Sequence, residues 1–483
     1  MKKLMLLICI PVFLLFSCPD GSDTDPIDES GVAKKNFSAQ SFKDGKFYQL
    51  EAGKLADGTY CTVWVERGAG IDKETAKKVA DEFDKNIYTK MISAFGINNN
   101  EFSFANELKD INEAEGGKLL ILLLDIKDDY QKGVNESAVG GYFLWSDLFP
   151  NEPGSNGLAM IYIDTNPGKP GEAASNMTLA HEMQHLMNEI TSQVLRSDGG
   201  NYSVMELWID EGLSGAAEYV YSGSHPVSRW GWYHSNGNGT NIKSSIDKGN
   251  NFYVWGNRTN ENPYAEQDDY ATAYLFFQWL RIQSSKGTGI YKDIIGSYSS
   301  DYSAVTAAAG GNWGDLLRDW LAANYINDAS SRYGYKNDPT LKTLNKHLFT
   351  GATAGLYPGE GVFSKINSNY SAPSSNGTIN YSLLTSSSIS SETSIASGAL
   401  LTYNVNTVNA VGGNFPQPVN GTATGVASVS VDVSVDGRFV SPPVTLSGPY
   451  WVSGGDVLRR NGRAESLSPA GVSRPSIRIA ENE

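Results

Sequence analysis

The segment of this chain with the clearest chemical potential is TLAHEMQHLMNE, residues 178–189, which holds His181, Glu182 and His185. Residues four apart in a helix lie one above the other, so the two imidazoles can reach a single metal ion. Glu182 then lies beside that ion, where its carboxylate can take a proton from a metal-bound water. The spacing therefore predicts a Zn²⁺ site capable of hydrolysis.

A zinc site that also holds a water needs a third protein ligand. The segment ELWIDEGLSGAAEYVY, residues 206–221, places Glu211 after 25 intervening residues (186–210) and Glu218 seven positions later, on the same face of a predicted helix. An ordinary solvated acidic face would show the same pattern by itself. Together with the two histidines, the pattern predicts Glu211 as the third ligand.

Small residues follow the predicted third ligand, namely Gly212, Ser214 and Gly215. We expect them to keep this helix slim, so that it approaches the histidine helix closely. The histidine helix should have an apolar face and, roughly opposite, a chemical face. The apolar face would consist of Leu179, Met183, Leu186, Met187 and Ile190, and the chemical face of His181, Glu182, His185 and Glu189.

Hydrophobic periodicity predicts the elements that must position these helices. A helix at residues 72–96 should begin at Asp72 as its cap, and further helices are expected at 270–282 and 312–326. Strands are expected at residues 46–53, 60–68, 118–126, 141–149 and 158–165.

The order of these elements predicts an α+β protein. Residues 36–110 should form a strand-rich N-terminal region with a helix, and residues 111–354 a catalytic region with a mixed sheet, the metal-site helices and a helical lobe. Residues 355–483 should form a β-sandwich-like accessory domain, because residues 427–446 alternate apolar and polar side chains around an Asp-Gly turn.

The first residues, MKKLMLLICIPVFLLFSC, predict export. A basic start and a short apolar run are typical of a signal peptide, here residues 1–17, and Leu15 to Cys18 resembles a bacterial lipobox apart from Phe16. We expect a lipid on Cys18, a flexible tether over 18–35, and attachment to the membrane of a bacterial cell envelope, on its periplasmic or extracellular face. An uncleaved anchor is the alternative.

Composition narrows the class of partner. Cys9 falls in the signal and Cys18 would carry lipid, which leaves Cys61 alone in the mature chain and predicts no intrachain disulfide framework. The formal net charge is −15 and the pI about 4.9, and we find no local basic patch in the sequence. Nucleic acid is therefore disfavoured as a partner.

The two motifs together resemble the gluzincin group of zinc metallopeptidases. WIDEGLSGAAEY is similar to the W-L-N-E-G-F-A-x-x-x-E stretch of its aminopeptidase branch, but the spacing of 25 is longer and a G-x-M-E-N stretch is missing upstream. The thermolysin branch has an Asp where this chain has Gly215. The chain resembles more closely the hyicolysin family of secreted bacterial neutral metallopeptidases. This resemblance covers about residues 119–326 and rests on the strand pattern, on LAHEMQHLMNE and on W-x-x-E-G-L-S.

This resemblance implies a Zn²⁺-dependent endopeptidase that acts on extracellular or periplasmic proteins. It implies that His181, His185 and Glu211 bind the metal, that Glu182 is the general base, and that Glu218 holds a ligand histidine. A surface-tethered adhesin or binding scaffold with a vestigial metal site is the alternative function.

The transition state of peptide hydrolysis needs a donor for its oxyanion. The possible donors are Tyr270, Tyr274, His225 and His234, and we favour Tyr270 because it lies at the start of a predicted helix. An extended substrate should pair with an edge strand beside the metal helix. The segments that could supply this edge are residues 140–145 and 158–164.

Overall fold

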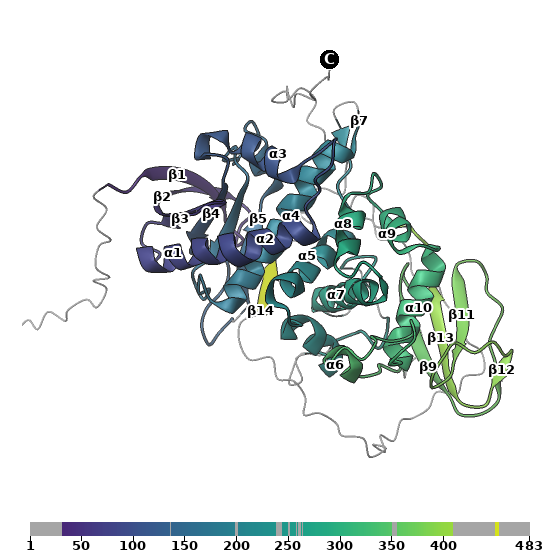
Figure 1. Ribbon diagram of the computed structural model, residues 1–483. Coiled ribbons are helices and arrows are strands. Elements are labelled where there is room, and N and C mark those ends of the chain that lie inside the picture. Colours follow the sequence, from purple (N-terminus) through teal and green to yellow (C-terminus); the bar gives the residue numbers. More distant parts are fainter. Residues whose placement is uncertain are drawn as a thin grey trace, which may run out of the picture.

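The fold is seen in a computed structural model (Figure 1). The residues that it describes are 31–135, 137–198, 201–237, 244–249, 252–256, 258, 262, 264–349, 355–408 and 450–453. The predicted signal and Cys18, and the alternating segment 427–446, lie outside this part of the chain. No helix within it is long and apolar enough to cross a membrane.

A seven-stranded mixed sheet forms the first layer, in the order β1-β2-β3-β4-β6-β5-β14. Strands β3, β4 and β6 are parallel, whereas β1, β2 and β5 each run antiparallel to a neighbour, and β14 runs parallel to β5. The strands are β1 (Lys34–Gln40), β2 (Phe47–Asp57), β3 (Cys61–Glu66), β4 (Leu119–Leu124), β5 (Ser137–Phe143), β6 (Met160–Asp164) and β14 (Tyr450–Ser453).

The central strand β4 is buried on both faces of the sheet. Its sequence LLILLL is buried throughout, as expected for a parallel strand covered on both sides. Because side chains alternate along a strand, Leu119, Ile121 and Leu123 pack with the helices, and the other three leucines join a second apolar cluster around Phe37 and Trp64.

Helices from the first half of the chain lie against the sheet. They are α1 (Lys73–Glu82), the π-helical turn η1 (Phe83–Ile87), α2 (Tyr88–Ala94), α3 (Phe104–Ile111) and α4 (Ala173–Leu195). Asp72 caps α1 as predicted, since its carboxylate accepts a hydrogen bond from the Thr75 amide at 2.7 Å. The long α4 carries the histidine motif along the sheet.

The remaining helices form a lobe beside α4. They are α5 (Leu207–Ser222), η4 (Val227–Gly231), α6 (Trp232–Ser235), α7 (Ala265–Gln283), α8 (Gly289–Ile295), α9 (Tyr302–Ala309) and α10 (Trp313–Ile326). Short elements complete the described chain: η2 (Glu113–Glu115), η3 (Trp145–Leu148), η5 (Leu341–Thr343), and the hairpin β7 (Ser197–Asp198) with β8 (Asn201–Tyr202).

An antiparallel sheet follows this lobe, at the end of the molecule opposite β1 (Figure 1). It has the order β11-β13-β9, formed by β9 (Gly361–Ile366), β11 (Ile379–Leu384) and β13 (Gly398–Asn404), and β10 (Tyr370–Ser371) pairs with β12 (Ser394–Ile395). The predicted α+β class with a C-terminal antiparallel sheet is confirmed. One cluster of buried apolar side chains runs from Leu55 to Tyr403, so packing is continuous across the predicted domain boundaries, which stay a prediction.

Two strand predictions near the site need correction. The strand predicted at 141–149 ends at Phe143, and a 3₁₀ turn follows at Trp145–Leu148, where the buried carboxylate of Asp147 accepts hydrogen bonds from Asn156 and Tyr162. Residues 158–164 do not supply an edge, because β6 lies between β4 and β5.

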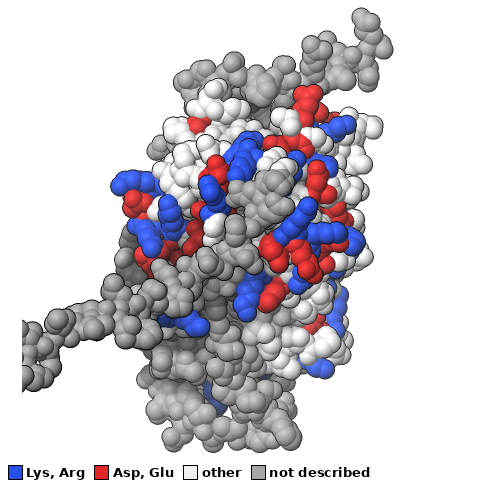
Figure 2. Space-filling model, turned by 90° about the vertical axis from the view of Figure 1, so that its left-hand side faces the viewer, with Lys and Arg blue, Asp and Glu red and all other residues white. Residues whose placement is uncertain are grey.

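Charged side chains are mixed on the surface seen in Figure 2. Lys and Arg lie among Asp and Glu over this face, and neither sign forms a continuous patch there. Opposite charges also pair along the chain, as between Lys77 and Asp81 and between Lys85 and Asp81, at 2.9 and 3.2 Å.

Candidate metal centre

The metal-site residues come from two helices that face each other. His181, Glu182 and His185 lie on α4, and Glu211 lies one turn into α5. All four side chains are buried, because α5 covers the chemical face of α4. The two predicted faces of α4 therefore exist, but neither is exposed to solvent.

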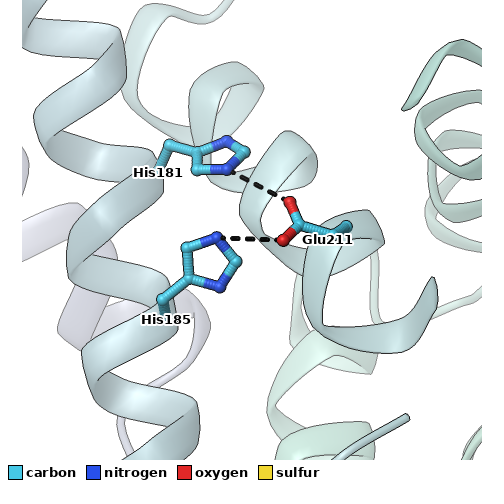
Figure 3. A group of neighbouring side chains, drawn as sticks. All are labelled: His181, His185 and Glu211. Carbon is cyan, nitrogen blue, oxygen red and sulfur yellow. Dashed lines mark ion pairs between the residues drawn. The ribbon is translucent and has the colours of Figure 1, made fainter. Parts of the chain in front are cut away.

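The three predicted ligands converge on one point (Figure 3). His181 Nε2 lies 3.4 Å from one carboxylate oxygen of Glu211, and His185 Nε2 lies 3.5 Å from the other. Four ligands at about 2.0–2.2 Å from a tetrahedral ion are separated from one another by about 3.3–3.6 Å. The spacing of these nitrogen and oxygen atoms therefore fits Zn²⁺.

Within the described residues, His181, His185 and Glu211 form the one group of side chains that could hold a metal ion. No other set of three or more His, Cys, Asp or Glu side chains there could hold an ion, and the ligand atoms of these three all lie within 4.8 Å of one another. Two nitrogens and a carboxylate oxygen are the donor set of catalytic zinc sites that keep a position open for water.

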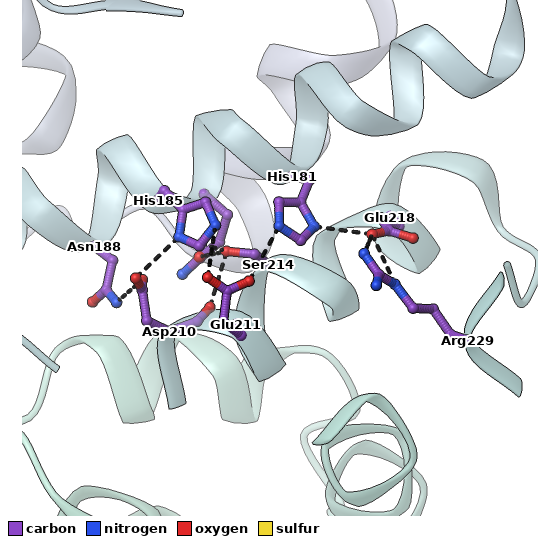
Figure 4. A network of polar contacts seen from close by, with 9 residues as sticks. His181, His185, Asn188, Asp210, Glu211, Ser214, Glu218 and Arg229 are labelled. Atoms are coloured by element: carbon purple, nitrogen blue, oxygen red, sulfur yellow. Dashed lines mark hydrogen bonds and ion pairs between the residues drawn. The ribbon is translucent and has the colours of Figure 1, made fainter. Parts of the chain in front are cut away.

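Two charged side chains, Glu218 and Arg229, orient the His181 ring through its Nδ1 atom. Its Nδ1 lies 2.9 Å from Glu218 Oε1, and the same oxygen accepts hydrogen bonds from Arg229 at 2.6 Å (Nη2) and 3.2 Å (Nε). Figure 4 shows these contacts in a row leading away from the metal site. Glu218 therefore stands where the resemblance implied a partner of a ligand histidine.

His185 has its own set of neighbours (Figure 4). Its Nδ1 lies 3.0 Å from the Asp210 carboxylate and 3.1 Å from the Ser214 hydroxyl, and Asp210 also accepts a hydrogen bond from Asn188. A partner on Nδ1 fixes the tautomer and leaves Nε2 for the metal. Both histidines are thus held with Nε2 toward Glu211.

The electrostatics of the site follow from this crowding of acids. Burial by itself lowers the pKa of His181, but hydrogen bonds to Glu211 and Glu218 outweigh it and raise the pKa, with the charge of Glu182 adding to them. Burial likewise opposes protonation of His185, yet Asp210 and Glu211 raise its pKa well above the usual range. The pocket therefore has a strong preference for positive charge.

The candidates for the oxyanion donor differ in what they contact. The Tyr274 hydroxyl lies 2.6 Å from His225 Nδ1, and the other nitrogen of that ring lies 3.0 Å from Asp338, so both side chains belong to a separate network. His234 packs edge-on against Trp230 at 5.6 Å. Tyr274 and His225 are therefore engaged outside the ligand cluster, whereas His234 Nδ1 is buried without a hydrogen-bond partner within the described residues.

Tyr270 lies one contact from the site. The Arg229 guanidinium that binds Glu218 also lies 4.4 Å from the centre of the Tyr270 ring. The Tyr270 hydroxyl is buried and has no hydrogen-bond partner within the described part of the protein. A buried hydroxyl without a partner is uncommon, which marks this group as one that a bound molecule can satisfy.

The small residues of α5 act differently from the prediction. A Cβ atom at Gly212 would lie 2.3 Å from the Phe277 ring of α7, and one at Gly215 would lie 3.4 Å from the Tyr274 ring. The glycines therefore let α5 approach α7, and not α4. Of the three small residues, only Ser214 faces the histidine helix, where its hydroxyl donates to Gln184 at 2.5 Å.

The predicted substrate edge is occupied by another part of the chain. Gly141 of β5 lies against α4, since a Cβ there would come within 2.9 Å of Thr178, one turn before His181. On its other side β5 pairs with β14, in a register that aligns Tyr450 with Ser137 and Ser453 with Gly141. The strand edge beside the metal helix is therefore paired with a C-terminal segment.

Two residues of the site were missed in the sequence. Asp210 directly precedes Glu211, and an acid at that position gives a signal that we could have used, since ligand histidines usually have a carboxylate or carbonyl on the second nitrogen. Arg229 lies eleven residues beyond Glu218 and outside both helices. Its position depends on the turn after α5, which no local pattern reveals.

Fold and site together define a zincin-like arrangement, in which a helix with HExxH lies beside a mixed sheet and a second helix supplies a glutamate. The chain is 28% identical over 328 residues to the neutral metalloprotease ShpI of Staphylococcus hyicus. The matched region covers 64% of this chain and 67% of that protein. No family model matches the chain. The predicted resemblance to bacterial neutral metallopeptidases is confirmed by this similarity, and the cluster of His181, His185 and Glu211 fits an HExxH zinc site.

Proposed function

We propose that this protein is a zinc-dependent endopeptidase of the gluzincin type. The observation that carries the proposal is the spacing of His181 Nε2 and His185 Nε2 from the two oxygens of Glu211, 3.4 and 3.5 Å, in a buried pocket that favours a cation. The similarity to a neutral metalloprotease supports the same class. An ion bound there would polarise the scissile carbonyl group and lower the pKa of water.

The residues of the chain would divide the remaining work. Glu182, buried beside the ligand His181, accepts the proton of the attacking water and passes it to the leaving amine. Tyr270 donates its hydroxyl to the developing oxyanion, and Glu218 and Asp210 hold the two ligand histidines. This division assigns a proton-transfer group, an electrostatic group and two positioning groups.

The proposed substrate is an extended segment of an extracellular or periplasmic protein. Strand β5 lies against α4 one turn from His181, so a peptide that replaced β14 at the outer edge of β5 would pass the metal site. The missing G-x-M-E-N stretch removes the feature that anchors a free amino group in the aminopeptidase branch. Cleavage within a chain is therefore favoured over removal of terminal residues.

We propose further that the protein is exported and anchored through a lipid on Cys18, on the basis of residues 1–18. Growth of a bacterial expression host with labelled palmitate should label the wild type and leave Cys18→Ser unlabelled. Label in neither protein would contradict the anchor without affecting the proposed activity.

The test of the activity combines zinc content with cleavage of casein. The purified protein from Asn36 onward should bind one zinc ion and cleave casein, and Glu182→Gln should keep the ion and lose cleavage by at least about 10²-fold. Glu189→Gln is the matched control, because Glu189 lies on the same helix and contacts Tyr202 and Gln193. It should retain both zinc and activity.

Zinc in neither the wild type nor the variants would refute the metal site. Stoichiometric zinc in a wild type that cleaves no member of a peptide library would instead favour the tethered binding scaffold.

A further inference from the structure

We propose that Arg229 is a positioning residue of the metal centre, which fixes Glu218 against His181 and holds the ring of Tyr270 with the same guanidinium group. This inference rests on the proposed function. It assigns to the turn after α5 a role in metal binding and in the placement of the oxyanion donor.

The first step of the argument is geometric. The guanidinium group of Arg229 donates to Glu218 Oε1 through both Nη2 and Nε, at 2.6 and 3.2 Å. The same oxygen is 2.9 Å from His181 Nδ1. Three donors therefore meet at one carboxylate oxygen, and the direction of the His181 ring depends on where that oxygen is held (Figure 4).

The second step concerns burial. Arg229 is 8% exposed and Glu218 6% exposed, so both charged groups are largely removed from solvent. A buried carboxylate that lost its cationic partner would be costly and would shift toward other donors. A lysine could neutralise the charge, but a single ammonium cannot reproduce the planar fork that fixes the oxygen.

The third step links Arg229 to Tyr270. The flat guanidinium lies 4.4 Å from the centre of the Tyr270 ring, and Trp255 packs edge-on against that ring at 4.9 Å. Cation–π stacking of this kind is directional, so it restricts the ring while leaving the hydroxyl to other partners. Arg229 thereby sets the distance between the proposed oxyanion donor and the side chain that orients a metal ligand.

A buried ion pair can also be purely structural, and the protein contains a pair suited as a control. Arg258 binds Glu360 through Nη2 at 2.7 Å and Nε at 2.9 Å, and both residues are more deeply buried, at 3% and 0% exposed. Arg258 also donates to the Gly355 carbonyl, and Glu360 accepts from the Tyr357 amide. Loss of this pair should therefore report the general cost of breaking a buried Arg–Glu contact.

The experiment measures the equilibrium zinc dissociation constant by competition with a chelator, together with the thermal midpoint, for full-length variants. Arg229→Gln should raise the dissociation constant by about 10–100-fold, as is usual when the partner of a ligand histidine is lost. Arg258→Gln should lower the thermal midpoint and change the dissociation constant by less than about 3-fold. Arg229→Lys should fall between Arg229→Gln and the wild type.

A double variant makes the pathway explicit. If Arg229 acts through Glu218, then Arg229→Gln should weaken zinc binding much less in a Glu218→Gln background than in the wild type. Equal weakening in both backgrounds, or a change in affinity no larger than that of Arg258→Gln, would overturn the proposal.

The kinetic part of the proposal has its own readout. Arg229→Gln assayed at saturating zinc should still show a lower kcat for casein than Arg258→Gln, with KM changed little, because the Tyr270 ring has lost its support. A zinc-binding protein without peptidase activity would refute the proposed function and leave the affinity measurements as the test of Arg229. A wild type that binds no zinc would refute both.

Discussion

Each of the two proposed ligand histidines has different neighbours at its two nitrogens. In both rings Nε2 faces Glu211, and Nδ1 faces an acid that has further partners of its own: Arg229 for Glu218 and Asn188 for Asp210. The strength of metal binding is therefore expected to depend on residues that never touch the ion.

Tyr270→Phe tests the oxyanion donor at the scale of a single atom. Loss of the hydroxyl should lower kcat by about 10²-fold with little change in KM, because the donor acts on charge that develops only in the transition state. Steady-state kinetics on a quenched peptide measures both constants. Tyr274→Phe is the control, since its hydroxyl lies 2.6 Å from His225, and equal losses in the two variants would contradict the assignment.

The sequence predicted the residues that share a helix and missed those that are joined by folding. Helical spacing puts His181, Glu182 and His185 on one face, and Glu211 and Glu218 on another, while the resemblance implied the role of Glu218. Arg229 meets Glu218 only because the chain turns back after α5 at η4. Tyr270 was favoured for a place at the start of a helix, but that reason is wrong, because α7 begins at Ala265 and buries this ring. The contact with Arg229 is what distinguishes it among the 25 tyrosines.

At the scale of elements, α5 is the piece that brings the site together. One side of it carries Glu211 and Ser214 toward α4, and the other side presses Gly212 onto Phe277 of α7. The close packing of α5 on α7 fixes how far Glu211 stands from the histidines. The sequence predicted that the small residues let this helix approach α4, but both glycines meet α7, because helical spacing does not show which helix packs on which face.

Two glycine substitutions on α5 should have opposite effects. Gly212→Ala places a methyl group 2.3 Å from the Phe277 ring, so it should destabilise the fold by about 1–3 kcal/mol and weaken zinc binding as α5 moves. Gly215→Ala meets Tyr274 at 3.4 Å, an ordinary contact, and should stabilise by about 0.5–1 kcal/mol because alanine favours the helix. Urea unfolding and zinc titration of both variants would show whether the effects have the expected signs.

The turn that follows β5 should make stability depend on pH. Burial raises the pKa of Asp147 from 3.8 to about 7, although Tyr162 and Asn156 donate hydrogen bonds to it. Because the folded pKa lies above the unfolded one, this contribution to stability is complete below about pH 4 and is lost as the pH rises through 7. The unfolding free energy should fall by a few kcal/mol over that range.

Asp147→Asn removes the titrating group and should flatten that pH dependence. Urea unfolding at pH 5 and pH 8, for the wild type and the variant, measures it. The same slope in both proteins would show that another group is responsible.

At the scale of the whole molecule, segments far apart in the sequence share one sheet. Strand β14 at residues 450–453 pairs with β5 at residues 137–143, although the antiparallel sheet of residues 361–404 lies between them in sequence. Hydrophobic patterns predicted β2, β3 and β4, which alternate or are apolar throughout, and missed β1 at Lys34–Gln40. They could not predict which strand lies next to β5, since pairing depends on contacts distant in sequence.

Removal of β14 should increase activity if a substrate uses the same edge. A variant that ends at residue 449 should cleave casein with a KM several-fold lower and an unchanged zinc affinity, because the backbone groups of β5 become available. Full-length Val452→Pro should behave similarly, since proline cannot donate to the strand pairing. An unchanged KM in both variants would show that substrates bind elsewhere.

The pairing of β14 with β5 also determines which substrates could compete for the edge of β5. A strand that belongs to the same chain meets its partner at an effective concentration on the order of millimolar, whereas a substrate meets it at its actual concentration. Dilution of the enzyme weakens an intermolecular inhibitor but leaves this intramolecular pairing unchanged. Folded proteins, which offer no free extended segment, would therefore lose to β14, and long unfolded chains would be the substrates able to replace it.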